Sequence, residues 1–128
     1  NDSKATSLKA SERALAGSKN IYWIVGGLPK IHDEINFKEV KQNIIKSYII
    51  GKHIFFFKNK LKNKIKFLVS KNLKKAVIDA IKDSILNKNK KNVILFSPGA
   101  ASFDQFENFE KRGEVFKKLS KIYAKKYL

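Results

Sequence analysis

The sequence contains no cysteine, which excludes a disulfide scaffold, a thiolate metal site and a cysteine nucleophile. Its longest apolar runs, Ile21–Val25 and Ile54–Phe57, fall far short of the ~20 residues that span a membrane, and no signal peptide is recognisable. We therefore expect a cytoplasmic protein without a membrane partner. Because the chain begins at Asn1 and contains no methionine, we also expect it to be a piece of a longer protein.

Arginine is scarce: Arg13 and Arg112 are the only arginines among 28 basic residues, and the rest are lysine. The net charge of +17 is typical of proteins that bind nucleic acid, but proteins that read nucleic acid rely on the forked arginine side chain. The charge is also uneven, since residues 41–91 carry +13 and residues 92–110 carry −3. We predict no nucleic-acid partner, and a basic α/β module that binds RNA or an anionic surface remains the alternative.

The apolar pattern alternates between short runs and amphipathic helices. Helices are predicted from Leu8, from a capping-box-like start at Asn36, over Leu73–Ile85, and near the C-terminus. Strands are predicted at Ile21–Val25, Tyr48–Ile50, Ile54–Phe57, Phe67–Val69 and Val93–Phe96; Ile54–Phe57 could also continue the strand before it. The 128 residues suit one domain. The alternation predicts an α/β fold, a Rossmann-like three-layer domain with a mostly parallel sheet flanked by helices.

Three loops follow the carboxyl ends of strands, where such sheets bind ligands. Asn1–Thr6 would qualify if a strand preceded it. It precedes a helix N-terminus, so Lys4 and Thr6 could help to bind an anion there, and Asp2 could accept hydrogen bonds from sugar hydroxyls. An ordinary polar helix cap is the alternative.

The other two loops are Gly26–Lys30 and Ser97–Asp104. Two glycines and a proline make a tight turn that would hold Lys30 firmly, although Lys30 could also be one more solvated lysine. The small residues of Ser97–Asp104 would let a ligand approach the backbone closely. We find no P-loop pattern, no metal-ligand cluster and no catalytic set in the sequence.

At these loops the sequence resembles the D-glutamate-adding ligases of the Mur ligase family. Asn1–Thr6 resembles the family's NDSKATN motif, Gly26–Lys30 its GG-x-x-K turn, and Ser97–Gly113 its SPxxASFDQFxxFxxRG motif. The order and spacing match over essentially the whole chain. Ser7 stands where the family usually has Asn, and Gly99-Ala100 stands where Ala-Cys is common.

The resemblance implies a C-terminal, amino-acid-binding domain, residues 1–128, that closes over a central ATPase domain. In the family's reaction, ATP converts the terminal carboxylate of UDP-N-acetylmuramoyl-L-alanine into an acyl phosphate, which the amine of D-glutamate attacks. ATP and Mg²⁺ would act in the full-length enzyme, which we expect to be a monomer, with metal ligands outside this segment. The segment alone is expected to be inactive.

The resemblance also implies roles for individual residues. Asp2 and Lys4 match nucleotide-binding positions, and Thr6 and Lys30 match positions that hold one carboxylate of D-glutamate. Ser102 and the backbone N–H of Phe109 match groups that hold the other carboxylate, with Phe103 beside them. No catalytic residue is expected in the segment. A related amide ligase with a different amino acid remains an alternative.

Overall fold

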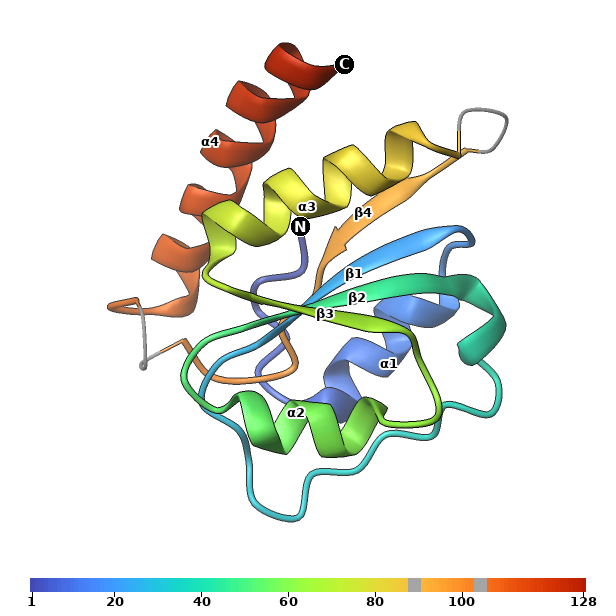
Figure 1. Cartoon of the computed structure of the whole chain (residues 1–128). Helices are drawn as coiled ribbons and strands as arrows, with labels where there is room; N and C mark the ends of the chain where they lie inside the picture. Colours follow the sequence, from blue (N-terminus) through green and yellow to red (C-terminus); the bar gives the residue numbers. More distant parts are fainter. Residues whose placement is uncertain (88–90, 103–105) are drawn as a thin grey trace.

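Strands and helices alternate along the chain in the computed structural model, which describes residues 1–87, 91–102 and 106–128 (Figure 1). Its elements are α1 (Leu8–Ala16), β1 (Ile21–Gly26), a 3-10 turn (Lys41–Asn43), β2 (Ile44–Ile50), α2 (Ile54–Leu61), β3 (Phe67–Lys71), α3 (Leu73–Ile85), β4 (Val93–Phe96) and α4 (Phe109–Tyr127). The predicted strands at Ile21–Val25, Phe67–Val69 and Val93–Phe96 are confirmed, as are the helices from Leu8 and over Leu73–Ile85.

The strands of the described residues form one parallel sheet in the order β3-β2-β1-β4. β1 is central, and every one of its six residues is buried. Trp23 pairs with Ser47 of β2 on one side and with Leu95 of β4 on the other. A strand covered on both faces loses the usual apolar–polar alternation, which explains the continuous apolar run in the sequence.

Helices cover both faces of the sheet, so the domain has three layers (Figure 1). Trp23 and Val25 face one apolar cluster, which lies against α1 and α2, whereas Tyr22 and Ile24 face a second cluster under α3 and α4. Alternate residues of β1 therefore supply the two cores, as the two-residue period of a strand requires. This arrangement confirms the predicted Rossmann-like α/β fold.

The predicted strand at Ile54–Phe57 is wrong, because these residues open helix α2. Phe57 and Leu61 are buried in the core cluster on the face of the sheet that α1 and α2 cover, whereas Phe55 is 77% exposed. Leu61 lies within a lysine-rich stretch, so the helical repeat of Phe57 and Leu61 is hard to recognise in the sequence. Short apolar runs fit a buried strand or a helix equally well, and the tertiary contacts decide between them.

The predicted helix from Asn36 is also wrong. Phe37 and Val40 lie in a turn, and their side chains are buried in the core cluster beside α1 and α2. Ile44 begins strand β2. The capping box does not form, since Asn36 accepts a hydrogen bond from the nearby Lys38 N–H in a local turn. Asn side chains favour such turns as readily as helix caps, so the motif alone could not separate the two.

A polar cluster between the sheet and helix α3 joins β2 to α3. Asp83 of α3 accepts hydrogen bonds from Tyr48 Oη at 2.7 Å and from Lys46 Nζ at 2.8 Å. Burial raises the pKa of Asp83, but the hydrogen bonds from Lys46 and Tyr48 outweigh burial and hold the pKa below its usual range. Burial also raises the pKa of Tyr48, and its bond to Asp83 adds to the effect. The charged form of Asp83 therefore stabilises the docking of α3.

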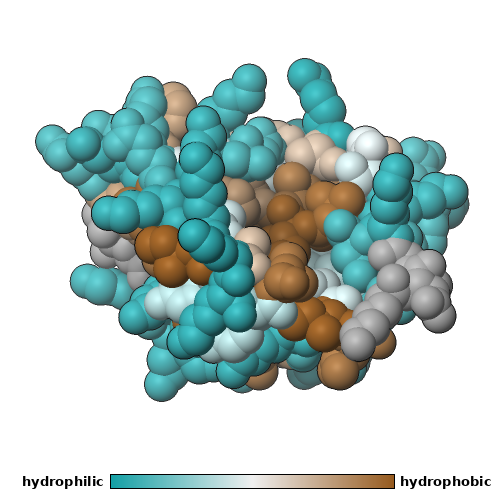
Figure 2. Space-filling view, turned by 90° about the horizontal axis from the view of Figure 1, so that it is seen from above, coloured by the Kyte–Doolittle hydropathy of each residue, from teal (hydrophilic) through white to brown (hydrophobic). Residues whose placement is uncertain are grey.

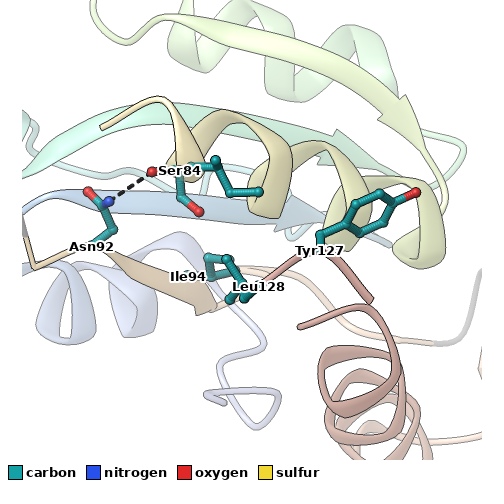
Figure 3. A pocket seen from close by; sticks show the side chains of 6 residues that line it. Ser84, Asn92, Ile94, Tyr127 and Leu128 are labelled. Atoms are coloured by element: carbon teal, nitrogen blue, oxygen red, sulfur yellow. Dashed lines mark hydrogen bonds between the residues drawn. The ribbon is translucent and has the colours of Figure 1, made fainter. Parts of the chain in front are cut away.

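From above, the surface is mainly hydrophilic around a central apolar area (Figure 2). A groove of about 560 Å³ lies between the C-terminal ends of α3 and α4 and the start of β4. Ile94, Tyr127 and Leu128 line it, together with Asn92, which donates to the Ser84 carbonyl at 3.0 Å (Figure 3). The groove lies at the amino end of β4, opposite the three loops singled out in the sequence. None of the helices in the described residues could cross a membrane.

Candidate functional site

The three loops meet at the carboxyl edge of the sheet. The Asp2 N–H donates to the Phe96 carbonyl at 2.6 Å, which places the first loop beside the end of β4. Gly26, at the end of β1, donates to the Pro98 carbonyl at 2.9 Å. Leu28 and Ala101 exchange two backbone hydrogen bonds of 2.9 Å as an antiparallel bridge. Backbone bonds therefore join all three loops.

Ser97 is the centre of a buried polar network below these loops. Its hydroxyl donates to Asp2 Oδ2 at 2.6 Å and lies 2.9 Å from the Ser11 hydroxyl of α1. Its carbonyl accepts from Trp23 Nε1 at 2.7 Å. The hydrogen bond from Ser97 holds the Asp2 carboxylate in place. Because a carboxylate can accept several hydrogen bonds, Asp2 retains the capacity to bind a further donor, such as a ribose hydroxyl.

Gly27 lets the second loop approach the third closely. Its φ is +141°, and a Cβ there would lie 2.6 Å from the Ala101 carbonyl oxygen. Only glycine adopts this backbone conformation without strain. The prediction that paired glycines make a sharp turn before Lys30 is confirmed, and the structure adds that the turn is also packed against the loop after β4.

Arg112 connects the first and third loops from below. The side chain is 1% exposed, and its guanidinium donates to the Ser3 hydroxyl at 3.1 Å and to the Ala100 carbonyl at 2.7 Å. The Ser3 hydroxyl in turn donates to the Phe109 carbonyl in the first turn of α4. No role was predicted for this arginine from the sequence, although its rarity in a chain dominated by lysine was the available signal.

Asp33 connects the second loop to the N-terminus of α1. Asp33 is 8% exposed; its carboxylate accepts from the Leu8 N–H at 2.5 Å, and its own N–H donates to the Lys30 carbonyl. The Ser7 hydroxyl accepts from the Ala10 N–H as the helix cap. Two N–H groups at this helix end are thus already satisfied, and one of them faces a carboxylate.

Two neighbouring grooves lie beside the N-terminus of α1. Lys30, Asp33 and Ser7 line the first, of about 740 Å³. Asp2, Lys4 and Ser7 line the second, of about 630 Å³. The predicted carboxylate-binding lysine and the predicted nucleotide-binding pair therefore lie in neighbouring grooves that share Ser7. Thr6, which is partly exposed, directly precedes this shared residue.

Two of the residues predicted for the second carboxylate site, Ser102 and Phe109, are among the described residues. Ser102 is 2% exposed and follows the Ala101 that pairs with Leu28, so it lies on the same edge of the sheet as the Lys30 loop. It is not among the described residues that line the Lys30 groove. Phe109 is the first residue of α4 and is 39% exposed. Phe103 lies outside the described residues.

The described residues contain no group of three or more His, Asp or Glu side chains that could hold a metal ion. His32 and His53 are both exposed, and His53 precedes the first residue of α2. The grooves at the carboxyl edge combine lysines with the carboxylates of Asp2 and Asp33, and the lysines suit the binding of an anionic group.

No protein-family model matches the chain. Curated relatives do: the chain is 40% identical over 121 residues to the UDP-N-acetylmuramoylalanine–D-glutamate ligase of Rickettsia prowazekii, and 43% identical over 116 residues to that of Bartonella henselae. The enzyme of the same name from Brucella abortus is 42% identical over 118 residues. The chain matches a C-terminal segment of the D-glutamate ligases.

These matches cover 91–94% of the chain but 25–27% of the ligases' own length. The chain thus spans about a quarter of the D-glutamate ligases that it resembles. This finding confirms the family resemblance drawn from the three loops, and the structure shows that the same loops meet at one edge of the sheet.

Proposed function

We propose that this chain is the amino-acid-binding, C-terminal domain of an ATP-dependent ligase that adds D-glutamate to UDP-N-acetylmuramoyl-L-alanine. The observation that carries the proposal is the meeting of the three motif-bearing loops at the carboxyl edge of the sheet. The names of relatives that are 40–43% identical support the reaction. The remaining parts of the enzyme, including the central ATPase domain, would lie elsewhere in a longer protein.

Lys30 and Thr6 would hold one carboxylate of D-glutamate. Lys30 lines a groove next to the N-terminus of α1, and Thr6 precedes the Ser7 that lines the same groove. An ammonium group and a hydroxyl that converge on one carboxylate form charge-assisted hydrogen bonds, which are stronger than neutral ones. Asp33 supports this role because it fixes the loop that carries Lys30 against α1.

The second carboxylate would be bound by Ser102 and by the backbone N–H of Phe109, with Phe103 packed beside them. Phe109 begins α4, and the N–H groups of a first helical turn lack partners within the helix, so they favour an anion. Ser102 is 2% exposed, so its hydroxyl would become available to a ligand only if the residues that cover it move. Two separate points of attachment would fix the direction of the amine.

The role of the domain in the reaction would be positioning. The amine nitrogen of D-glutamate attacks the carbon of the acyl phosphate. The C–N bond forms, the C–O bond to phosphate breaks, and the amine loses a proton. Correct orientation can lower such a barrier by several kcal/mol, about 7–11 in ideal cases. Closure against the ATPase domain would exclude the water that hydrolyses acyl phosphates.

Bound ATP with Mg²⁺ supplies the phosphoryl group that activates the L-alanine carboxylate. Asp2 suits a role on the ribose, because Ser97 holds its carboxylate while acceptor capacity remains. The exposed Lys4 lies in the same groove and suits a phosphate group. The metal ligands would come from outside this segment.

The deciding experiment replaces Lys30 by alanine in the full-length ligase and measures product formation against D-glutamate concentration. Losing a charge-assisted contact of about 1.5–3 kcal/mol should lower kcat/KM for D-glutamate by about 10- to 150-fold. Lys38→Ala is the matched control, because Lys38 is an exposed lysine on the same connecting segment and does not line the Lys30 groove. A Lys30→Ala enzyme with wild-type kinetics would refute the role of Lys30.

The same assay tests the choice of amino acid. D-glutamate should support product formation, whereas D-aspartate, which is one methylene shorter, and L-glutamate should support little. A wild-type enzyme that prefers another amino acid would favour the related-ligase alternative. An enzyme that forms no product with any amino acid, yet retards RNA in a salt-dependent way, would favour the basic-module alternative.

A further inference from the structure

Arg112 is one of two arginines among 28 basic residues, and it is only 1% exposed. Burying a cationic side chain is unfavourable unless its donors are well satisfied. Here the guanidinium contacts both the first and the third loop. One of its terminal nitrogens also approaches the second loop, since a Cβ on Gly27 would lie 3.4 Å from that nitrogen. The position itself indicates a role in holding the loops together.

The donors of Arg112 point to two different loops. Nε donates to the Ser3 hydroxyl at 3.1 Å, and one terminal nitrogen donates to the Ser3 carbonyl at 2.5 Å. The other terminal nitrogen donates to the Ala100 carbonyl at 2.7 Å. The guanidinium carbon also lies 5.8 Å from the centre of the Phe96 ring at the end of β4. One planar group therefore fixes the separation of the first and third loops.

The contacts extend to the start of α4. The Ser3 hydroxyl, which accepts from Arg112, donates to the Phe109 carbonyl at 2.7 Å. Asn1 adds a hydrogen bond to the Gly113 carbonyl at 3.1 Å, and a Cβ on Gly113 would lie 3.1 Å from that of Ser3. The first loop is thus packed and bonded along the first turns of α4, the helix that carries Arg112.

We propose that Arg112 is a positioning residue for D-glutamate. It sets the distance between the loop that carries Thr6 and the loop that carries Ser102, and through Ser3 it sets the first turn of α4 that begins with Phe109. The two halves of the carboxylate site then keep the spacing that one dicarboxylate needs. This inference rests on the proposed function, and Arg112 acts through these residues without touching the substrate.

Lysine could not replace arginine in this role. The guanidinium presents donors in a rigid planar fork, so it can reach Ser3 and Ala100 at the same time. An ammonium group is a compact centre on a flexible stem, and it would satisfy one loop while leaving the carbonyl of the other without its donor. Since lysine provides 26 of the 28 basic residues in this chain, the use of arginine at this buried position agrees with a need for the fork.

The test uses the full-length ligase with Arg112→Lys and Arg112→Ala. For both we expect kcat/KM for D-glutamate to fall by about 10- to 100-fold, as a small misplacement of binding groups would cause, with most of the change in KM. The KM for UDP-N-acetylmuramoyl-L-alanine should stay unchanged. In Arg112→Ala, added guanidinium ion well below unfolding concentrations should restore part of the lost kcat/KM. Lys121→Ala, an exposed position on the same helix, is the control and should behave as the wild type.

The outcomes separate this inference from the proposed function. A wild-type enzyme without D-glutamate-dependent product formation overturns the proposed function and this inference with it. An active wild type, with Arg112 variants that melt at lower temperature but keep the wild-type KM for D-glutamate, leaves the proposed function standing and overturns the positioning role. If neither Arg112 variant folds, Ser3→Ala decides, because it removes the hydroxyl between Arg112 and Phe109: a raised KM for D-glutamate supports the proposal and an unchanged KM overturns it.

Discussion

Replacing Asp33 by alanine removes the carboxylate that joins the Lys30 loop to helix α1. Asp33 is 8% exposed, and its carboxylate accepts a hydrogen bond from the Leu8 N–H in the first turn of the helix. The substitution leaves that N–H without its acceptor and frees the segment after Lys30. We therefore expect two effects, a loss of stability and a looser Lys30.

The magnitude follows from the two interactions that are lost. A hydrogen bond to a charged group contributes about 1.5–3 kcal/mol, and an anion at a helix N-terminus adds about 0.3–1 kcal/mol. The Asp33→Ala variant should therefore lose about 2–4 kcal/mol of unfolding free energy. For a domain of this size, 1 kcal/mol corresponds to roughly 4 °C, so Tm should fall by about 8–16 °C. Asp33→Asn keeps an acceptor and should lose about half as much.

Thermal and urea unfolding would measure the stability. Steady-state kinetics of the full-length ligase would measure the effect on Lys30, which should appear as a raised KM for D-glutamate. Glu34→Ala is the matched control for stability, because the Glu34 side chain is 81% exposed and its ion pair with Lys60 lies at the surface. Such pairs contribute at most about 1 kcal/mol. If Asp33→Ala and Glu34→Ala unfold at the same temperature, the reasoning about the helix end is wrong.

Three further outcomes are expected. Gly27→Ala should lower the free energy of unfolding by about 1–3 kcal/mol in denaturant unfolding, because alanine would be forced into a positive φ. Gly17→Ala is the control and should be close to neutral, because a Cβ there would make ordinary van der Waals contacts. Equal losses of stability in the two variants would contradict the packing of the Gly27 loop. Because Asp83 has a lowered pKa, its charge stabilises the fold above an unfolded-state pKa of about 3.9, and this contribution is lost as pH falls through the lower folded pKa. The Tm difference between the wild type and Asp83→Asn should therefore shrink below about pH 4, and a difference independent of pH would refute the ion pair. Finally, the isolated chain should show no D-glutamate-dependent ATP hydrolysis, and any such activity would contradict its assignment as one domain of the ligase.

The candidate site was only partly predictable from the sequence. The three loops were found because small residues and glycines after strands are visible locally, and because their motifs resemble those of the ligase family. The contacts that hold them were missed. Arg112 bonds to Ser3 across 109 positions of sequence, and Asp33 bonds to Leu8 across 25. No periodic pattern links residues so far apart, so only the folded chain shows that these two charged side chains are buried.

The sequence by itself determined the α/β class, the central strand β1 and the helix α3, because a strand covered on both faces must be apolar throughout and a long amphipathic helix repeats its apolar residues every three or four positions. Only the tertiary structure decided that Ile54–Leu61 is a helix and that Ile44–Ile50 is one continuous strand. It also decided that Ser102 is buried. The physical reason is the same in each case: a short apolar or polar segment has several conformations of similar local free energy, and contacts with residues distant in the sequence select one of them.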